Sequence, residues 1–227
     1  TLADIAAANT EFTSPYLARR PVKKTCYIVI AGDRGLAGGY NANLFKLVAQ
    51  AAEGKECCVL PVGKKALERY AHRGCRLLSD KYTRTEQVKG DGCREMADLL
   101  IERFLSGQCA KVTLVSTTLL SALVQDAVVT TLLPVTPDSD AKHASQMIME
   151  PDPATILAAV MPDYLAGQLY AAVCDAFASE VSARRNAMDS ATKNAQKMID
   201  ELSLHYNRAR QGSITQEITE IVAGAEE

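Results

Sequence analysis

The spacing of apolar residues predicts that the last third of the chain is one long helix. Residues 163–222 contain no proline, and glycine occurs there only at Gly167 and Gly212. Apolar or small side chains recur in alternating steps of three and four residues, the heptad-like stripe of a helix that packs against another helix. The stripe consists of Tyr170, Val173, Phe177, Val181, Met188, Ala191, Ala195, Met198, Leu202 and Ala209. Because a helix of about 60 residues is roughly 90 Å long, we expect it to project from the rest of the protein as a rod.

The first two thirds of the chain predict strands that alternate with helices. Short runs rich in β-branched and apolar residues indicate buried strands, at residues 25–31, 56–62, 111–117, 121–135 and 146–150. The fourth run is both apolar and β-branched, so it could form either element and favours a strand. Amphipathic spacing predicts helices, at residues 41–52, 64–72 and 91–105. A further helix begins at 153–160, and Pro162 either kinks or restarts it.

This alternation is typical of an α/β protein. It predicts a Rossmann-like, mostly parallel sheet with flanking helices, followed by the long C-terminal helix. We divide the chain accordingly into three parts. Residues 1–24 are the end of a helix and a loop, residues 25–150 form the α/β globular domain, and residues 151–227 form the long helix.

Composition restricts the classes of function. The 227 residues carry a formal net charge of -2, and 48% are hydrophobic and 23% charged. These values are typical of a folded soluble protein and give no basic excess for binding nucleic acid. The chain has no run of about 18 apolar residues that would span a bilayer, and its first residues lack the pattern of a secretory signal. We therefore expect no nucleic-acid partner and no direct membrane span.

Candidate metal and catalytic residues are sparse. The seven cysteines form no C-x-x-C pair, and the three histidines are widely scattered, so we expect no metal site. The odd number of cysteines and their apolar surroundings indicate reduced thiols. No G-x-S-x-G elbow is present, and no histidine adjoins a suitable serine or cysteine, so no catalytic residue is expected.

A glycine-rich turn follows the first predicted strand. Its residues are Gly32, Asp33, Arg34, Gly35, Gly38 and Gly39. A strand, a glycine turn and a helix together form many phosphate and dinucleotide sites. However, the spacing matches neither G-x-G-x-x-G nor G-x-x-x-x-G-K-[ST], and no Lys-Ser/Thr pair follows. We interpret the six residues as a structural turn that binds no cofactor, and keep a nucleotide-binding α/β enzyme as the alternative.

The long helix requires a partner. A helix of this length is not stable by propensity alone, and the alanines of its stripe allow a second helix axis to approach closely. Only one long helix is predicted in this chain, so the partner lies in another molecule or in a segment that the sequence does not contain. A generic coiled-coil scaffold is consistent with these observations.

Several long motifs resemble one known family, the gamma subunit of the bacterial, rotary, proton-translocating ATP synthase. The turn GDRGLAGGYNANLFK is similar to the family's first strand, turn and helix, and residues 97–135 are similar to its middle segment. The segment MEPDPATILAAVMPDYLAGQLY resembles the start of its long helix. The most specific motifs are ASEVSARRNAMDSATKNA and LSLHYNRARQGSITQEITEIVAGA near the C-terminus.

The resemblance implies a central-stalk rotor subunit that couples proton-driven rotation to ATP synthesis and performs no catalysis itself. The long helix would form an antiparallel coiled coil and contact the alpha and beta subunits. The globular domain would contact the epsilon subunit and the membrane c-ring. The protein would lie at the cytoplasmic face of the bacterial plasma membrane, as a peripheral part of the complex.

Partner contacts carry over by motif. Arg184 in ARRNAM, and Gln211 and Thr215 in RQGSIT, match positions where the family's shaft contacts the catalytic subunits. Ile214 and Ile218 match the apolar tip of the shaft. One departure concerns the first long helix of the family, because only its last stretch resembles residues 1–8. We therefore expect most of that N-terminal helix to be absent from this sequence.

Overall fold

A computed structural model describes residues 14–18, 21, 24–54, 56–71, 76–136, 150 and 152–225. The chain divides into two compact units. Unit 1 covers Thr1–Arg184 and unit 2 covers Arg185–Glu227. The predicted division of the chain at residues 24 and 150 stays a prediction.

The described residues of unit 1 form a five-stranded sheet with the strand order β3-β2-β1-β4-β5. The strands are β1 (Lys24–Ile30), β2 (Glu56–Val62), β3 (Arg76–Leu77), β4 (Lys111–Leu119) and β5 (Gln125–Leu133). The pairings β1–β2, β1–β4 and β2–β3 are parallel, and only β5 runs antiparallel to its neighbour β4. The sheet is therefore mostly parallel, as its near-continuous apolar strands predict, because parallel strands are covered on both faces.

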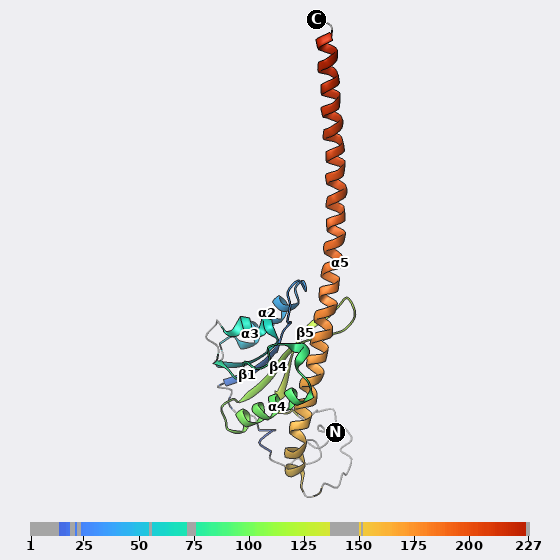
Figure 1. The fold of residues 1–227 in the computed structure, drawn as a ribbon. Coiled ribbons are helices and arrows are strands. Elements are labelled where there is room, and N and C mark those ends of the chain that lie inside the picture. Colours follow the sequence, from blue (N-terminus) through green and yellow to red (C-terminus); the bar gives the residue numbers. More distant parts are fainter. Residues whose placement is uncertain are drawn as a thin grey trace. The chain divides into compact units, whose positions relative to one another are not determined.

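Helices cover both faces of this sheet, and the alternation of side chains along the strands decides which face each residue meets. On one face, Ile28 and Leu60 pack with α4 (Gly90–Leu105) and with the first part of α5 (Pro153–Ala225). On the other face, Val29 and Val59 pack with α2 (Tyr40–Ala52) and α3 (Lys64–Ala71). Figure 1 shows α2 and α3 on the side of the sheet opposite to α4. The result is a three-layer α/β unit, the predicted fold class.

The first part of α5 is a core element of unit 1. Its buried side chains recur mostly at steps of four residues, which places them on one stripe of the helix. They are Leu157, Met161, Leu165, Leu169, Val173 and Ala176, all with an exposed fraction of 4% or less. The helix passes through Pro162 without interruption. Because this proline has no N–H to donate, the packing of the stripe must offset the lost intrahelical hydrogen bond.

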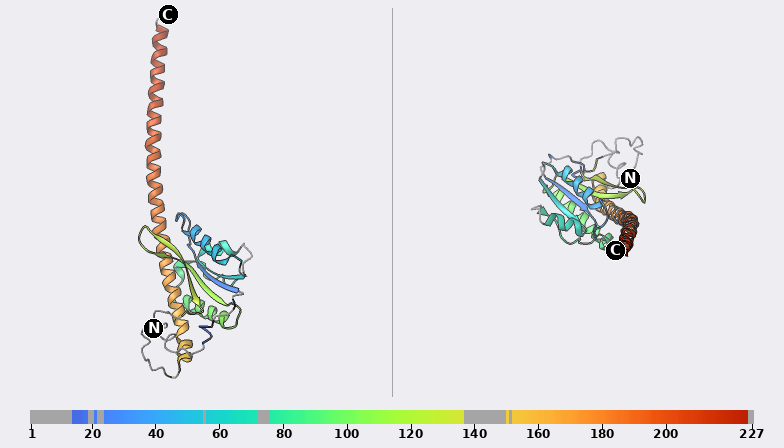
Figure 2. Two further views of the ribbon diagram at one scale, coloured as in Figure 1. Left: turned by 180° about the vertical axis from the view of Figure 1, so that it is seen from behind. Right: turned by 90° about the horizontal axis from the view of Figure 1, so that it is seen from above.

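The hairpin of β4 and β5 lies beside α5 within unit 1 (Figure 2). The Ser182 hydroxyl donates to the Ala122 carbonyl at 2.7 Å, and Gln125 Nε2 donates to the Ser182 Oγ at 3.5 Å. The tip of the hairpin is thus bonded to the same helix that fills the core.

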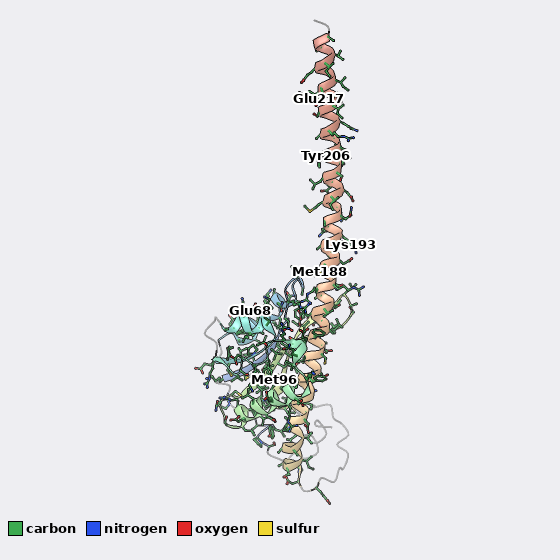
Figure 3. The ribbon with its side chains drawn as sticks, viewed as in Figure 1. Glu68, Met96, Met188, Lys193, Tyr206 and Glu217 are labelled. Atoms are coloured by element: carbon green, nitrogen blue, oxygen red, sulfur yellow. The ribbon has the colours of Figure 1, made fainter. Side chains whose placement is uncertain are left out.

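Unit 2 consists of the remaining helical residues of α5, from Arg185 to Ala225. From Met188 onward every described residue is exposed. Figure 3 labels Met188, Lys193, Tyr206 and Glu217 along this part of the helix, and Met96 within the side chains of unit 1. At about 1.5 Å per residue the helix of unit 2 is about 60 Å long.

One helix of the described residues, α5, is long and apolar enough to cross a membrane by length and composition, with an 18-residue window of mean hydropathy 1.3. The sequence pattern had predicted no such segment. The buried residues Leu157, Met161, Leu165 and Leu169 show that α5 contributes apolar side chains to the core of unit 1. An apolar composition is therefore as typical of a buried core helix as of a membrane helix.

Most predicted elements are confirmed to within a few residues, including the strand β5 in the ambiguous run at 121–135. The long helix is also confirmed, and it already begins at Pro153, because Pro162 does not end it. The predicted helix end at residues 1–8 and all but the last residue of the strand predicted at 146–150 lie outside the described residues, and Glu150 itself is not in a strand. The short helical turn η1 (Thr85–Gln87) was not predicted.

We expect Leu165→Ala to lower the free energy of unfolding of unit 1 by about 2–5 kcal/mol, because it leaves a cavity between α5 and the sheet. Leu165 is fully buried, whereas Val160 on the same helix is 39% exposed. The matched control Val160→Ala should change the free energy of unfolding by less than about 0.5 kcal/mol. Urea denaturation followed by circular dichroism measures both, and equal losses would contradict the assignment of α5 to the core.

Candidate functional site

The glycine turn between β1 and α2 is bound to α5 by one buried carboxylate. Glu180 is 3% exposed, and its two oxygens accept the backbone N–H groups of Asp33 at 3.3 Å and Arg34 at 3.1 Å. Arg184 forms an ion pair with the same carboxylate, and its Nε donates to the Gly35 carbonyl at 3.3 Å. These residues form the turn–helix junction, defined as Asp33, Arg34, Gly35, Glu180 and Arg184.

Two glycines shape the turn: Gly32 leaves room for the Glu180 side chain, and Gly38 serves the chain reversal. A Cβ atom on Gly32 would lie 2.8 Å from the Glu180 Cδ, which is closer than real Cβ atoms come. Gly38 has a φ of 57°, in the left-handed region that favours glycine. Leu36 also adopts a left-handed φ of 61°, and its side chain is 79% exposed. The turn therefore places glycine where the carboxylate and the chain reversal require it.

Asp33 connects the turn to two further elements of unit 1. Its carboxylate accepts the Thr85 N–H at 2.9 Å and the Lys64 N–H at 3.1 Å. Lys64 is the first residue of α3, so the carboxylate of Asp33 occupies the N-terminus of that helix, where anions are stabilised. Among the described residues Asp33 binds backbone and hydroxyl groups.

A second hydrogen bond fastens the start of α2 to α5. The Tyr40 hydroxyl donates to the Ala176 carbonyl at 2.9 Å, and Tyr40 is 6% exposed. Burial raises the pKa of Tyr40 well above its ordinary value, so the hydroxyl stays protonated and remains a donor. The Asn41 side chain accepts the Gly32 N–H at 2.9 Å. Both ends of the turn are therefore bound.

The turn offers no free anion site of the kind that a phosphate would need. In phosphate-binding turns the backbone N–H groups point at the ligand. Here the N–H groups of Asp33 and Arg34 point at the Glu180 carboxylate, which belongs to the chain itself. A phosphate at the same place would meet a buried negative charge. The geometry therefore supports the structural interpretation of the turn over the nucleotide-binding alternative.

The four C-terminal residues carried over as partner contacts lie together on one face of unit 2. Gln211, Ile214, Thr215 and Ile218 are spaced by three and four residues in α5 and thus share a side of the helix. Ile214 is 46% exposed and Ile218 is 56% exposed. The Thr215 hydroxyl donates to the Gln211 carbonyl of its own helix at 2.8 Å. This face, the C-terminal face, is available to a partner, whereas Arg184 already binds within unit 1.

A longer apolar stripe occupies another side of the unit 2 helix. Its larger members are Met188, Met198, Leu202 and Tyr206, which are between 48% and 67% exposed. Exposed apolar side chains in such a row mark a surface that binds another molecule or segment. The need of the stripe for a partner helix stays a prediction.

Metal-ligating side chains and thiols are a further class of candidate group in the described part of the chain. No group of three or more His, Cys, Asp or Glu residues there is placed to hold a metal ion. Of the six described cysteines, Cys26, Cys58, Cys93 and Cys109 are buried, and Cys174 is exposed.

Sequence reasoning found the turn and Arg184 but missed the residue that joins them. Glu180 precedes Arg184 by four residues, a spacing that predicts an ion pair on a helix surface. That spacing does not predict that the pair is buried against a turn 146 residues away in sequence. Tyr40 and Ser182 were missed for the same reason, because their partners are distant in the chain.

Comparison with known proteins gives consistent results. The family model described as ATP synthase matches residues 1–227. The ATP synthase gamma chain of Moorella thermoacetica is 40% identical over 224 residues, covering 98% of this chain and 79% of the relative. The rotor of the Euglena gracilis mitochondrial ATP synthase in rotational state 1 has a TM-score of 0.61 at 18% identity, covering 94% of this chain and 83% of that one. A chain from the OSCP/F1/c-ring structure of the same complex in rotational state 3 has a TM-score of 0.61 at 19% identity, covering 98% and 84%.

We expect Gly32→Ala to lower the free energy of unfolding of unit 1 by about 1–3 kcal/mol, because the new methyl group collides with the buried Glu180 side chain. Gly35 is the matched control, since a Cβ there would meet nothing within 4 Å. Gly35→Ala should stay within about 0.5 kcal/mol of the parent. Urea denaturation of both variants measures the difference. Two variants of equal stability would show that the turn does not pack closely on Glu180.

Proposed function

The chain belongs to the ATP synthase gamma-chain family, and from this premise we propose that it is the central-stalk rotor subunit of an ATP synthase. Such a subunit turns inside a ring of catalytic subunits and transmits rotation to them. The proposal assigns the chemistry of ATP to the catalytic subunits and none of it to this chain. Its own contribution is mechanical.

The observation that most supports this function is that a single helix has a buried part and an exposed part. α5 runs without interruption from Pro153 to Ala225. Its first part is buried in the core of unit 1, and its later residues are exposed. A helix that only stabilised a domain would have no need of the exposed residues. A helix that transmits torque needs both a fixed base and a free surface for its partners.

The turn–helix junction supplies the fixed base in this proposal. A helix held only by an apolar stripe can slip about its axis, because apolar contacts are not directional. Hydrogen bonds and ion pairs are directional. Glu180 and Arg184 hold the turn, Tyr40 holds the Ala176 carbonyl, and Ser182 holds the Ala122 carbonyl. These bonds enter α5 from different elements and would resist rotation of the helix within unit 1.

The exposed side chains of the unit 2 helix are the surface through which rotation would act on the catalytic subunits. A rotor changes the affinity of a catalytic subunit only if its contacts differ between the conformations of that subunit. The apolar stripe and the C-terminal face lie on different sides of the unit 2 helix and differ in composition. As the helix turns, each surrounding subunit would meet a different set of side chains. Unequal contacts of this kind bias which catalytic conformation is favoured.

The partners follow from this assignment. The C-terminal face, with Gln211, Ile214, Thr215 and Ile218, contacts the alpha and beta subunits. Arg184 contacts them through the 18% of its side chain that its ion pair with Glu180 leaves exposed. Unit 1 contacts the epsilon subunit and the membrane c-ring. The complex uses a proton gradient and lies at the cytoplasmic face of a bacterial plasma membrane. The family relation and the exposure of the four residues in unit 2 support these assignments.

The rotor function predicts that the chain works only within its complex. Assembled with the alpha and beta subunits of an ATP synthase, it should support ATP hydrolysis coupled to rotation of a probe attached to unit 1. Isolated, it should give no binding heat with ATP in titration calorimetry, because the amides of the glycine turn already bind Glu180. Micromolar affinity of the isolated chain for ATP would instead support a nucleotide-binding enzyme.

Replacing both isoleucines of the C-terminal face by alanine should weaken binding to the alpha and beta subunits by about tenfold or more, since a loss of 1.4 kcal/mol already has that effect. Alanine preserves helix propensity, so Ile214→Ala with Ile218→Ala leaves the helix intact. Glu220→Gln, on another side of the helix, is the matched control and should bind normally. Affinity is measured by surface-based binding and helicity by circular dichroism. Normal binding by the double variant would remove these residues from the interface.

A further inference from the structure

Two buried thiols lie side by side in the sheet of unit 1. Cys26 in β1 and Cys58 in β2 are paired in register. Neighbouring strands lie about 4.8 Å apart, which falls within the range of Cα separations that a disulfide bridges. Both cysteines belong to the same buried cluster, so their side chains point to the same face of the sheet. The pair therefore has the placement that a cross-strand disulfide requires.

The other cysteines of the described residues lack this placement. Cys57, the neighbour of Cys58, packs against the cluster on the opposite face. Cys109 is buried on the same face as Cys58 but lies outside the paired strands. Cys174 is exposed on α5. Among the described cysteines, register therefore singles out Cys26 as the partner of Cys58.

A small hollow gives access to Cys58. It has a volume of about 20 Å³ and is lined by Cys58, Cys109, Lys24, Arg76, Leu78, Arg103 and Gln108. This volume holds one water-sized molecule. Arg76 and Gln108 at its rim are exposed to solvent. Hydrogen peroxide, which has one oxygen atom more than water, is an oxidant close to this size.

The hollow is also cationic. Lys24, Arg76 and Arg103 contribute three positive charges to its lining. The Arg103 Nε is buried and has no hydrogen-bond acceptor among the described residues. A donor left in this state favours an anion beside it, because an unsatisfied buried polar group is costly. The hydrogen bond from Cys26, followed by the charges of Lys24 and Arg76, lowers the pKa of Cys58, and the same hydrogen bond raises the pKa of Cys26.

We propose that Cys58 is a peroxide-reactive thiol and that Cys26 resolves its oxidised form as a disulfide between β1 and β2. In the first step the Cys58 thiolate attacks one oxygen of hydrogen peroxide, the O–O bond breaks, and hydroxide leaves and is protonated to water. The product is a sulfenic acid on Cys58. In the second step the Cys26 sulfur attacks the Cys58 sulfur, the S–O bond breaks, and a second water leaves. Peroxide is reduced to two waters, and two thiols are oxidised to one disulfide.

The surroundings suit each step. The cations of the hollow stabilise the attacking thiolate and the negative charge that develops on the leaving oxygen. The neighbouring position of Cys26 makes the second step intramolecular, which favours it over further oxidation of the sulfenic acid. The site does not depend on the rotor function, because none of its residues belongs to the turn–helix junction or to the C-terminal face.

The test treats the intact reduced chain with one equivalent of hydrogen peroxide at neutral pH and maps the products by mass spectrometry. The expected product lacks two hydrogen atoms and yields a linked peptide pair containing Cys26 and Cys58, which dithiothreitol separates. The variant Cys26→Ala should accumulate sulfenic acid on Cys58, trapped by dimedone. The variant Cys58→Ala should lose the linked pair and reduce peroxide consumption at least tenfold.

Cys174→Ala is the matched control, because this thiol is exposed and lies outside the hollow. It should form the Cys26–Cys58 linkage at the parent rate. The products of the parent chain alone decide between the outcomes. A variant that fails to fold therefore does not leave the proposal untested. If the parent is oxidised at Cys174 while Cys26 and Cys58 remain reduced, or if Cys58 links to a different cysteine, the proposal is wrong.

Discussion

The buried Glu180 carboxylate is the interaction on which the arrangement of unit 1 depends. Removing a carboxylate from water is costly, and the cost is offset only when hydrogen bonds and an opposite charge surround it. Two backbone N–H groups and Arg184 provide these partners. The same contacts fix the conformation of the glycine turn, and through Asp33 they extend to α3 and to Thr85. Two carboxylates in series, Glu180 and Asp33, thus tie the long helix to the turn, to α3 and to Thr85.

The two parts of α5 are stabilised in different ways. Residues up to Ala176 bury an apolar stripe against the sheet, and this burial stabilises the helix and the sheet together. From Met188 to Ala225 the helix gains no such burial among the described residues. The stability of this segment rests on helix propensity and on pairs at a spacing of four residues, such as Lys193 with Asp189 at 2.7 Å. Such pairs contribute only about 0.2–0.5 kcal/mol each, which is less than the burial of one apolar side chain contributes in the first part of α5.

The sequence predicted those features that depend on neighbours in the chain. The period of the stripe revealed α5, and the apolar runs revealed β1, β2 and β4 with nearly correct bounds. Contacts between distant residues could not be predicted in the same way. Nothing near Glu180 indicates that Gly32 leaves room for it, and nothing near Cys26 indicates that Cys58 lies beside it. The carboxylate at the centre of the junction and the register of the thiol pair emerge only from the order of the strands and the path of α5.

The hydrogen bond from the Thr215 hydroxyl to the Gln211 carbonyl restricts what a neighbouring molecule can offer at that position. A hydroxyl has one proton and two lone pairs. Its proton is already engaged within the helix, and only the lone pairs remain. Thr215 is therefore an acceptor alone, so a complementary residue must bring an N–H or O–H group, and a carboxylate facing it would be repelled. Any partner that contacts the helix at Thr215 must therefore match a polarity that an internal hydrogen bond of the helix has already set.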